Sequence, residues 1–284
     1  MASVPYGSEG TRSLLQKHHF VTKKQLGQNF LIDTRVLDGI VEAVNPSDRT
    51  VVLEVGPGAG ALTTHLAKRA KRVIAIEKDE SLRPVLSDAL TSATNVDVVF
   101  EDCLKVDLVQ LVTPYLDEGD ELVFAANLPY YITTPILFAV LESGLPVKRA
   151  VVMVQREVAD RMAAKPGGKD YGVLSVSVQY RARVNRLFIV PPSAFVPQPG
   201  VDSAVVLLDC ANPPDARVKD EAVFFRIVRA AFATRRKTLL NALAGALSIP
   251  KDVCAARIEA SGIDPSARAE TLSISQFSKL AEQF

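Results

Sequence analysis

Residues 52–60 read VLEVGPGAG, an apolar run that passes directly into a turn with three glycines. The apolar run predicts a strand that is buried on both faces, as in a parallel sheet. Gly56, Gly58 and Gly60 let the backbone turn tightly and approach a ligand without a side-chain clash. The helix that is expected next offers unpaired N–H groups at its start. This arrangement is typical of nucleotide sites, although a tight packing turn has the same appearance.

Further apolar runs follow this strand, and amphipathic stretches of helix length separate them. The alternation predicts an α/β fold with a parallel sheet and helices on both of its faces. The predicted strands are residues 50–55, 72–76, 96–100, 121–126 and 150–154, and the predicted helices are residues 62–69, 81–90, 104–112 and 135–143.

The pattern changes after residue 154. Residues 174–178 read LSVSV and alternate like a strand, although an amphipathic helix also fits. Residues 187–190 and 203–208 predict two more strands, with the proline-rich PPSAFVPQPG between them. Residues 219–284 carry helical periodicity and almost no strand signal.

Three regions are expected from these patterns. Proline-rich residues 211–214 look like a linker, so we place a boundary near residues 210–216. The opening residues show no apolar segment of a secretory signal and are expected to be flexible. The predicted regions are a flexible tail at residues 1–22, an α/β domain at residues 23–212 and a helical domain at residues 213–284.

Composition points to a globular protein of the reducing cytosol. Of the 284 residues, 48% are hydrophobic and 23% are charged, which argues against disorder. No apolar run approaches the roughly 20 residues of a membrane span. Cys103, Cys210 and Cys254 are too far apart for a disulfide framework or a zinc site. We therefore expect a cytoplasmic protein without a membrane anchor or a metal.

Charge is segregated along the chain, although the net charge is only +1. Residues 97–121 hold eight acidic residues and one basic residue. Residues 148–186 hold nine basic and three acidic residues, and residues 217–237 hold seven and two. The basic stretches fit either a face for a phosphate backbone or a set of solvated helix surfaces.

Polar side chains follow the predicted strands at their carboxyl ends. Glu77 comes 21 residues after Gly56, where a carboxylate can accept both ribose hydroxyls of a nucleotide. Asp102 follows the third strand and can receive an adenine amino group. Asn127 follows the fourth strand and opens the sequence NLPY. Ligands bind beyond these strand ends, so one ligand can touch Gly56 and the three polar residues together. Both S-adenosylmethionine and NAD fit such a site.

Nine stretches between about residue 23 and residue 237 carry a family resemblance through their order and spacing. They are KKQLGQNFLID, VLEVGPGAGALT, AIEKD, EDCLKVD, NLPYYITTPILF, VQREVADRM, YGVLSVSVQY, PPSAFVPQPGVDSAVV and RRKTLLNAL. The chain resembles the rRNA adenine dimethylase family, in particular its KsgA/RsmA group of 16S rRNA adenine-N6,N6-dimethyltransferases.

The resemblance implies a fold, a cofactor and a cofactor site. The fold is a Rossmann-like seven-stranded methyltransferase sheet with a small all-helical C-terminal domain, in which YGVLSVSVQY is a helix. The cofactor is S-adenosyl-L-methionine. Its predicted site consists of Asn29, Leu31, Gly56, Glu77, Asp102 and Asn127, with the adjacent Gln28, Gly58, Lys78 and Cys103.

The sequence NLPY suits transfer to an exocyclic amine. The side-chain oxygen of Asn127 and the carbonyl of Leu128 can accept the two N6 hydrogens of adenine, and the following proline biases Leu128 to an extended backbone. Tyr130 offers a stacking face, Phe195 would cover the other face, and Tyr131 is expected to pack. Both Tyr130 and Phe195 also fit as core residues. The predicted catalytic residues are Asn127, Leu128, Pro129, Tyr130 and Phe195.

The resemblance also implies the substrate, which is two adjacent adenosines near the 3′ end of 16S rRNA in an assembling 30S subunit. A monomer is expected. Phosphate contacts would position this RNA without reading its sequence. The candidates for these contacts are Arg156, Arg161, Lys165, Lys169, Arg235, Arg236 and Lys237.

Three other interpretations stay open. The Erm group methylates 23S rRNA, but its members commonly carry Ile at the position of Leu128 and lack a full PPSAFVPQPGVDSAVV match. A non-catalytic assembly factor would keep the fold, and the intact NLPY sequence argues against that loss. An NAD-dependent enzyme is the most distant of the three.

Overall fold

The computed structural model describes residues 8–213, 218–234 and 236–284, and these residues form two compact units. The first unit contains the described residues up to Ala159 together with Asn185–Ala211. The second unit contains Asp160–Val184 and the described residues from Asn212 to Phe284. Residues 160–184 therefore group with the C-terminal part of the chain, whereas the sequence placed them in the first domain. That each predicted domain is a separate folding unit stays a prediction.

The elements follow one another in an order that alternates strands and helices through the first unit. The strands are β1 (Phe30–Leu31), β2 (Thr50–Val55), β3 (Arg72–Glu77), β4 (Val96–Phe100), β5 (Glu121–Asn127), β6 (Val147–Gln155), β7 (Arg183–Val190), β8 (Phe195–Val196) and β9 (Ser203–Asp209). The α-helices are α1 (Ser8–Lys17), α2 (Thr34–Val44), α3 (Ala61–Ala67), α4 (Arg83–Ala89), α5 (Leu108–Val112), α6 (Thr133–Leu141), α7 (Arg156–Ala163), α8 (Val173–Arg181), α9 (Glu221–Phe232), α10 (Leu239–Leu247), α11 (Lys251–Ala260) and α12 (Ile274–Ala281). Short 3-10 helices are η1 (Lys24–Leu26), η2 (Glu80–Leu82), η3 (Thr113–Tyr115), η4 (Pro192–Ala194) and η5 (Ala269–Thr271).

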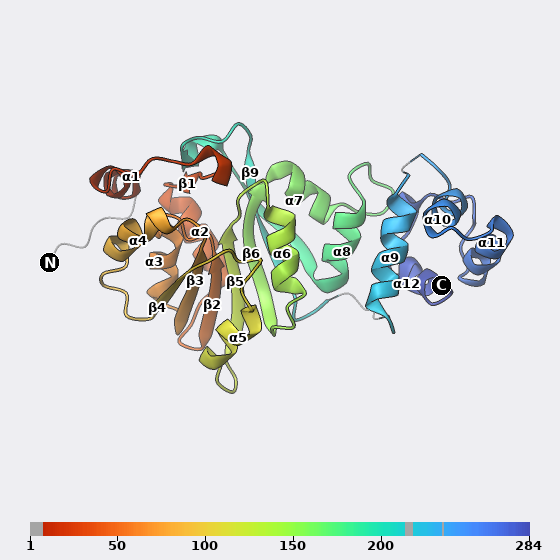
Figure 1. The fold of residues 1–284 in the computed structure, drawn as a ribbon, viewed down its shortest axis with the longest axis horizontal. Helices are drawn as coiled ribbons and strands as arrows, with labels where there is room; N and C mark the ends of the chain where they lie inside the picture. The colour runs from red at the N-terminus through yellow and green to blue at the C-terminus, as the bar shows by residue number, and fades with distance from the viewer. Residues whose placement is uncertain (1–7, 214–217, 235) are drawn as a thin grey trace. The chain divides into compact units, whose positions relative to one another are not determined.

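A seven-stranded sheet with the order β4-β3-β2-β5-β6-β9-β7 dominates the first unit (Figure 1). The five strands from β4 to β6 in this order are parallel, and β9 runs antiparallel to β6. Every residue of β2 is buried, which explains the continuous apolar run in the sequence. The α/β sheet that the sequence predicted is confirmed.

The register of the parallel strands brings their carboxyl ends to one edge. Val55 of β2 pairs with Ile76 of β3, and Glu54 pairs with Ala125 of β5. Asn127 is the last residue of β5 and lies opposite Met153 of β6. The glycine turn, the acidic end of β3 and the NLPY sequence therefore start from neighbouring strand ends, where ligands of open α/β sheets bind.

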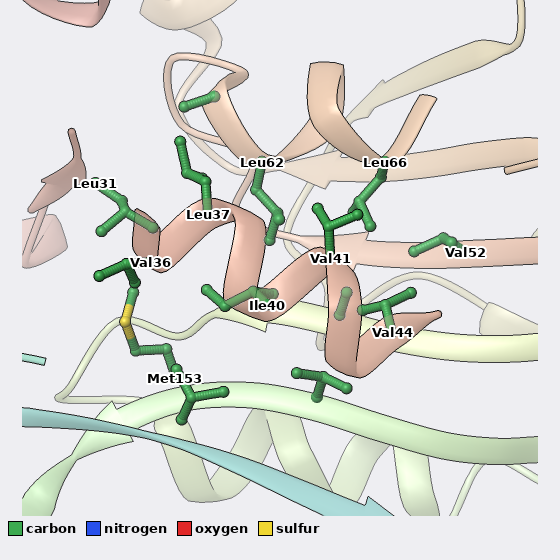
Figure 2. Close-up of a cluster of buried hydrophobic side chains, with 14 of the residues drawn as sticks. Leu31, Val36, Leu37, Ile40, Val41, Val44, Val52, Leu62, Leu66 and Met153 are labelled. Atoms are coloured by element: carbon green, nitrogen blue, oxygen red, sulfur yellow. The ribbon is translucent and has the colours of Figure 1, made fainter. Parts of the chain in front are cut away.

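Helix α2 covers one face of the sheet and packs in a hydrophobic core of this unit (Figure 2). Its first turn is capped by the Asp33 carboxylate, which accepts a hydrogen bond from the backbone of Arg35. Five apolar side chains then recur at helical spacing and point toward α3 and the strands. They are Val36, Leu37, Ile40, Val41 and Val44, and they meet Val52, Leu62, Leu66 and Met153.

Helix α1 lies within the residues that the sequence predicted to be a flexible tail. Residues 1–7 lie outside the described residues, but residues 8–17 form a helix instead of a flexible segment. Leu14 and Leu15 are buried, and they pack in a cluster of apolar residues with α4. The burial of these two leucines contributes roughly 1.5–3 kcal/mol each toward holding this helix against the rest of the first unit.

Two helices differ in detail from what the local sequence pattern favoured. Residues 174–178 belong to α8 and not to a strand, as the family resemblance implied. The alternation was misleading because α8 is buried nearly all round, with its serines as hidden as its valines. Helix α5 begins at Leu108, four residues later than predicted at 104, because the side chain of Asp107 caps it there.

The second unit is helical in its C-terminal part, as predicted, and it has its own aromatic core. Tyr180 of α8 lies 4.7 Å from Phe224 of α9 between ring centroids, and Phe224 lies 4.9 Å from Phe225. Phe232 at the end of α9 packs against Phe277 of α12 at 5.8 Å. These contacts join α8, α9 and α12 into one cluster.

Two kinds of feature are absent from the part of the chain that the structure describes. Over the described ranges, every helix is too short or too polar to span a bilayer. No three histidine, cysteine, aspartate or glutamate side chains of those residues gather in an arrangement that can hold a metal ion.

Candidate active site

A pocket opens where β2, β3 and β5 end. It holds about 1100 Å³ of empty space, including the part that is open to solvent. The residues predicted to bind the cofactor all line it, and they are Gln28, Asn29, Leu31, Gly56, Gly58, Glu77, Lys78, Asp102, Cys103 and Asn127. Their part in binding stays a prediction.

The glycine turn after β2 requires its glycines. Gly56, Gly58 and Gly60 have φ angles of 76°, 58° and 81°, in the left-handed region that side chains avoid. A Cβ atom on Gly58 would also lie 3.1 Å from the ring of Phe30. The turn therefore keeps its backbone against the pocket, and it delivers the N-terminus of α3 there.

Glu77 is held in place by backbone groups at the end of β3. One carboxylate oxygen accepts from the N–H of Gly58 at 3.1 Å, and the other accepts from Asp79 at 2.8 Å. Burial raises the pKa of Glu77, while these hydrogen bonds oppose the rise. The carboxylate is thus oriented before any ligand binds.

Asp102 already has partners on both oxygens. The Lys78 ammonium donates to one oxygen at 2.9 Å, and the backbone of Leu104 donates to the other at 3.1 Å. The hydrogen bond from Lys78 holds the pKa of Asp102 below its usual value. The neighbouring Cys103 is buried, which raises the pKa of its thiol to about 11, so it contributes a neutral wall.

Residues 26–31 line one side of the pocket, and together with residues 23–25 they are called the N-terminal segment below. The Gln28 side chain donates to Asp79 at 2.7 Å and accepts from the backbone of Lys23 at 2.7 Å. The amide of Gln28 therefore fixes this segment, although the sequence assigned it to the cofactor. Asn29 donates its side-chain N–H to the carbonyl of Gly27 at 3.1 Å. Leu31 is buried in the core and pairs with β8.

The NLPY sequence forms a turn at the end of β5. The Asn127 Nδ2 donates to the carbonyl of Asn29 at 3.1 Å, so the Asn127 Oδ1 is the free end of this amide. The Leu128 side chain is buried, and its N–H donates to Met153 at 3.1 Å. Within the described residues, no hydrogen bond to the Leu128 carbonyl is found. The Pro129 carbonyl instead accepts from Thr133 at 3.0 Å.

The aromatic residues depart from the predicted division of roles. Tyr130 is half-buried, and its hydroxyl lies 2.6 Å from the Oγ of the buried Ser203. Burial raises the pKa of Tyr130. Tyr131, which was expected to pack, has 55% of its surface exposed, and its ring lies against Gly27 at the pocket.

Phe195 lies deeper than its predicted role suggests, and that role stays a prediction. The sequence predicted that its ring would cover one face of a bound base, but Phe195 is fully buried and does not line the pocket. It pairs with Leu31 between β8 and β1 and belongs to the core around α2. The pairing of two short strands turns this ring inward, and the sequence gives no signal for such a long-range pairing.

Sequence reasoning also missed Glu54, Asp79 and Phe30. Glu54 lines the pocket and is only 1% exposed, and its Oε2 has no hydrogen-bond partner within the described residues. Burial raises the pKa of Glu54 to about 8, with the charge of Glu77 adding to the effect. An acidic residue inside the apolar run TVVLEV was the signal for Glu54. Asp79 and Phe30 carried no comparable signal.

The predicted RNA contacts lie on the surface where the structure describes them. Arg156 in the first unit is exposed and has Asp202 at 3.5 Å. The second unit contains the exposed Arg161, Lys165, Lys169, Arg236 and Lys237. Arg235 lies outside the described residues.

Comparison with known proteins gives a consistent result. Residues 19–284 match the profile of the family described as ribosomal RNA adenine dimethylase. A relative from Bacillus mycoides (strain KBAB4), named ribosomal RNA small subunit methyltransferase A, is 49% identical over 274 residues, which cover 95% of this chain and 94% of the relative. A relative of the same name from Anoxybacillus flavithermus is 48% identical, with 96% and 94% covered.

Two solved structures are also similar. A dimethyladenosine transferase from Plasmodium falciparum has a TM-score of 0.74 and 28% identity, with 88% of this chain and 95% of that chain covered. The 23S rRNA methyltransferase ErmE has a TM-score of 0.67 and 26% identity, with 90% and 99% covered.

Proposed function

Because the chain belongs to the ribosomal RNA adenine dimethylase family, we propose that it dimethylates N6 of two adjacent adenosines near the 3′ end of 16S ribosomal RNA. It is an S-adenosylmethionine-dependent methyltransferase of ribosomal RNA. The relatives named for the small subunit support the choice of 16S RNA, since they are nearly half identical over almost the whole chain.

The observation that carries the proposed chemistry is the orientation of the Asn127 amide. Its nitrogen is bonded to the Asn29 carbonyl, so its oxygen is the atom left to accept a hydrogen from a substrate amine. The Leu128 carbonyl follows directly at the pocket and supplies a second acceptor. An exocyclic amine has two hydrogens to donate, and two adjacent acceptors match it.

The pocket also fits the cofactor chemically. A carboxylate for ribose hydroxyls is present in Glu77, already oriented by two backbone N–H groups. The unpartnered Oε2 of Glu54 is a buried polar atom that a polar ligand would satisfy. We assign the glycine turn, Glu77 and Asp102 to hold the nucleoside part. When bound, S-adenosylmethionine would supply the methyl group from its sulfonium, because the neutral thioether that remains is an excellent leaving group.

The chain's own residues have to overcome the poor nucleophilicity of the amine. The N6 lone pair is delocalised into the adenine ring, and two hydrogen bonds to Asn127 and Leu128 favour a more tetrahedral nitrogen. Tyr130 stacks on the flipped base, which contributes roughly 1–3 kcal/mol toward the cost of unstacking it. Positioning supplies most of the rate, because the methylated nitrogen loses its proton without a strong base.

The substrate particle is proposed to be an assembling 30S subunit in the cytoplasm, bound by a monomer of this protein. Exposed basic side chains would contact RNA phosphates and fix its orientation. These residues are Arg156, Arg161, Lys165, Lys169, Arg235, Arg236 and Lys237.

The test is transfer of labelled methyl groups to small subunits from a strain that lacks the modification. N6,N6-dimethyladenosine is expected in the digested 16S RNA, and its absence would disprove the proposal. The Asn127→Ala variant should lose at least about a hundredfold in transfer rate, because the amine loses an acceptor and its alignment. Its cofactor affinity should change little, and full activity of this variant would refute the assigned chemistry.

The similarity to ErmE supports one second candidate, methylation of 23S RNA. Expression in a macrolide-sensitive host separates the two functions. Resistance together with dimethyladenosine in 23S RNA would favour the second candidate, while modification confined to 16S RNA favours the first.

A further inference from the structure

We propose that Asp79, which does not line the pocket, positions the Asn127 amide through a chain of hydrogen bonds across the N-terminal segment. The inference rests on the proposed function of Asn127 as the acceptor for the substrate amine. Asp79 is a positioning residue in this account, since it touches neither the substrate nor the cofactor pocket.

The series of hydrogen bonds starts at the buried carboxylate of Asp79. Asp79 is 3% exposed and follows β3 two residues after Glu77. Its Oδ1 accepts from the backbone and hydroxyl of Ser81 at 3.0 and 2.6 Å, and from the Lys23 ammonium at 2.5 Å. Its Oδ2 accepts from the Gln28 side chain at 2.7 Å. Both oxygens thus hold the N-terminal segment, Oδ1 through Lys23 and Oδ2 through Gln28, and Oδ1 also caps η2.

The series of hydrogen bonds continues from Gln28 to Asn127 in the NLPY turn at the end of β5. Gln28 uses both ends of its amide, with Nε2 on Asp79 and Oε1 on the Lys23 backbone. The next residue, Asn29, offers its carbonyl to the Asn127 Nδ2 at 3.1 Å. The position of this carbonyl therefore determines which way the Asn127 oxygen points.

The residues that these hydrogen bonds connect come from distant parts of the sequence. Gln28 and Asp79 are 51 residues apart, and Asn29 and Asn127 are 98 residues apart. The backbone N–H of Asp79 also bonds to Glu77. Asp79 consequently connects the proposed ribose carboxylate with the proposed amine acceptor, so both groups share one support. Without the Asp79 carboxylate, only the remaining contacts of the N-terminal segment would hold Gln28 in place.

A polarity swap separates positioning from capping. Asp79→Asn keeps an oxygen for Ser81, but it turns an N–H toward the Gln28 Nε2, so two donors face each other. Gln28→Glu alone brings two carboxylates together. In the double variant, the introduced glutamate accepts from the introduced asparagine and from the Lys23 backbone. Both hydrogen bonds are restored, and the net charge is that of the wild type.

The first measurement is the single-turnover rate of methyl transfer at saturating S-adenosylmethionine, with affinity for the cofactor measured separately. Each single variant should lose about tenfold to a hundredfold in rate, as for a small misplacement of a reacting group. The double variant should recover to within a few fold of the wild type. Unimpaired single variants, or a double variant as slow as Asp79→Asn, would overturn the proposal.

Asp88→Asn is the matched control. Asp88 also anchors the N-terminal part of the protein, through Lys17 at 2.6 Å and His18 at 2.9 Å, but among the described residues no series of hydrogen bonds leads from Asp88 to Asn127. Its rate should equal that of the wild type. A loss of rate equal to that of Asp79→Asn would show that general anchoring of the N-terminal region matters, and not the chain through Gln28.

A second measurement needs no RNA. The side-chain N–H₂ signals of Asn127, identified by their loss in Asn127→Ala, report its hydrogen bond in heteronuclear NMR spectra. They should shift in Asp79→Asn and return in the double variant. If the wild type transfers no methyl group, the proposed function fails, while these signals still decide whether Asp79 positions Asn127. Unshifted signals in Asp79→Asn would refute the positioning.

Discussion

At the scale of single residues, Glu54 stands out because a carboxyl group is costly inside a buried strand. It is 1% exposed in the middle of β2, and burial raises its pKa to about 8 from an ordinary value of 4.5. The carboxyl is therefore mostly protonated at neutral pH in the folded protein. The unfolded chain releases this proton near pH 4.5, so the folded state binds more protons between the two values.

Glu54 should make the protein less stable as the pH rises. Its contribution is fully present below about pH 4.5 and is lost as the pH rises through about 8. Glu54→Gln cannot ionise, so it should exceed the wild type in free energy of unfolding by roughly 1–4 kcal/mol at pH 9 and differ less at pH 5. Urea unfolding from pH 5 to pH 9 measures this. The exposed Glu42→Gln should keep the wild-type profile, and parallel profiles for Glu54→Gln and the wild type would contradict the assignment.

The Lys78–Asp102 ion pair makes a second prediction at this scale. Asp102 is the proposed acceptor for the adenine amino group of the cofactor. The Lys78 ammonium, however, already donates a hydrogen bond to one of the Asp102 oxygens at 2.9 Å. Lys78→Met removes the competing donor, so S-adenosylhomocysteine should bind about threefold to tenfold more tightly. Calorimetric titration measures the affinity, with the exposed Lys105→Met as the control. Weaker binding would instead mean that Lys78 itself holds the cofactor.

At the scale of elements, α2 determines how firmly the sheet supports the site. Leu37 is 1% exposed and points from α2 toward α3 (Figure 2). Leu37→Ala should lower the free energy of unfolding by about 2–5 kcal/mol, through lost burial and the cavity that remains. The exposed Asp38→Ala on the same helix should change it by less than about 0.5 kcal/mol. Denaturant titration tests both, and equal losses would show that α2 does not pack as described.

The elements also show what the sequence can predict. The strands and the glycine turn were predictable because continuous burial and left-handed glycines leave local signals in VLEVGPGAG. The sequence pattern of helix α8 resembled a strand, because burial on nearly all sides removes the 3.6-residue period of hydrophobic side chains that marks a helix. Phe195 and the link from Gln28 to Asp79 depend on partners that are distant in sequence. No local pattern records such pairs, so the residues at the strand ends that line the pocket were predictable from the sequence and the residues that support them were not.

At the scale of the whole molecule, a protein with a net charge of only +1 has to bind a polyanionic RNA. The segregated basic stretches answer this locally. Residues 165 and 169 are lysines on an exposed loop of the second unit, and acidic residues cluster instead at 97–121. A local excess of positive charge attracts phosphates, while the overall balance limits non-specific association with nucleic acid.

Lys165 and Lys169 should therefore contribute to the salt dependence of RNA binding. Each phosphate contact adds about 0.7–0.9 to the slope of log affinity against log salt, so Lys165→Gln/Lys169→Gln should reduce that slope by about 1.4–1.8. Lys251→Gln/Lys279→Gln removes the same charge from exposed sites on α11 and α12 of the same unit and should leave the slope nearly unchanged. Filter binding of 16S RNA at several salt concentrations gives both slopes. Equal reductions would mean that net charge attracts the RNA, because a specific face predicts that only the loop lysines matter.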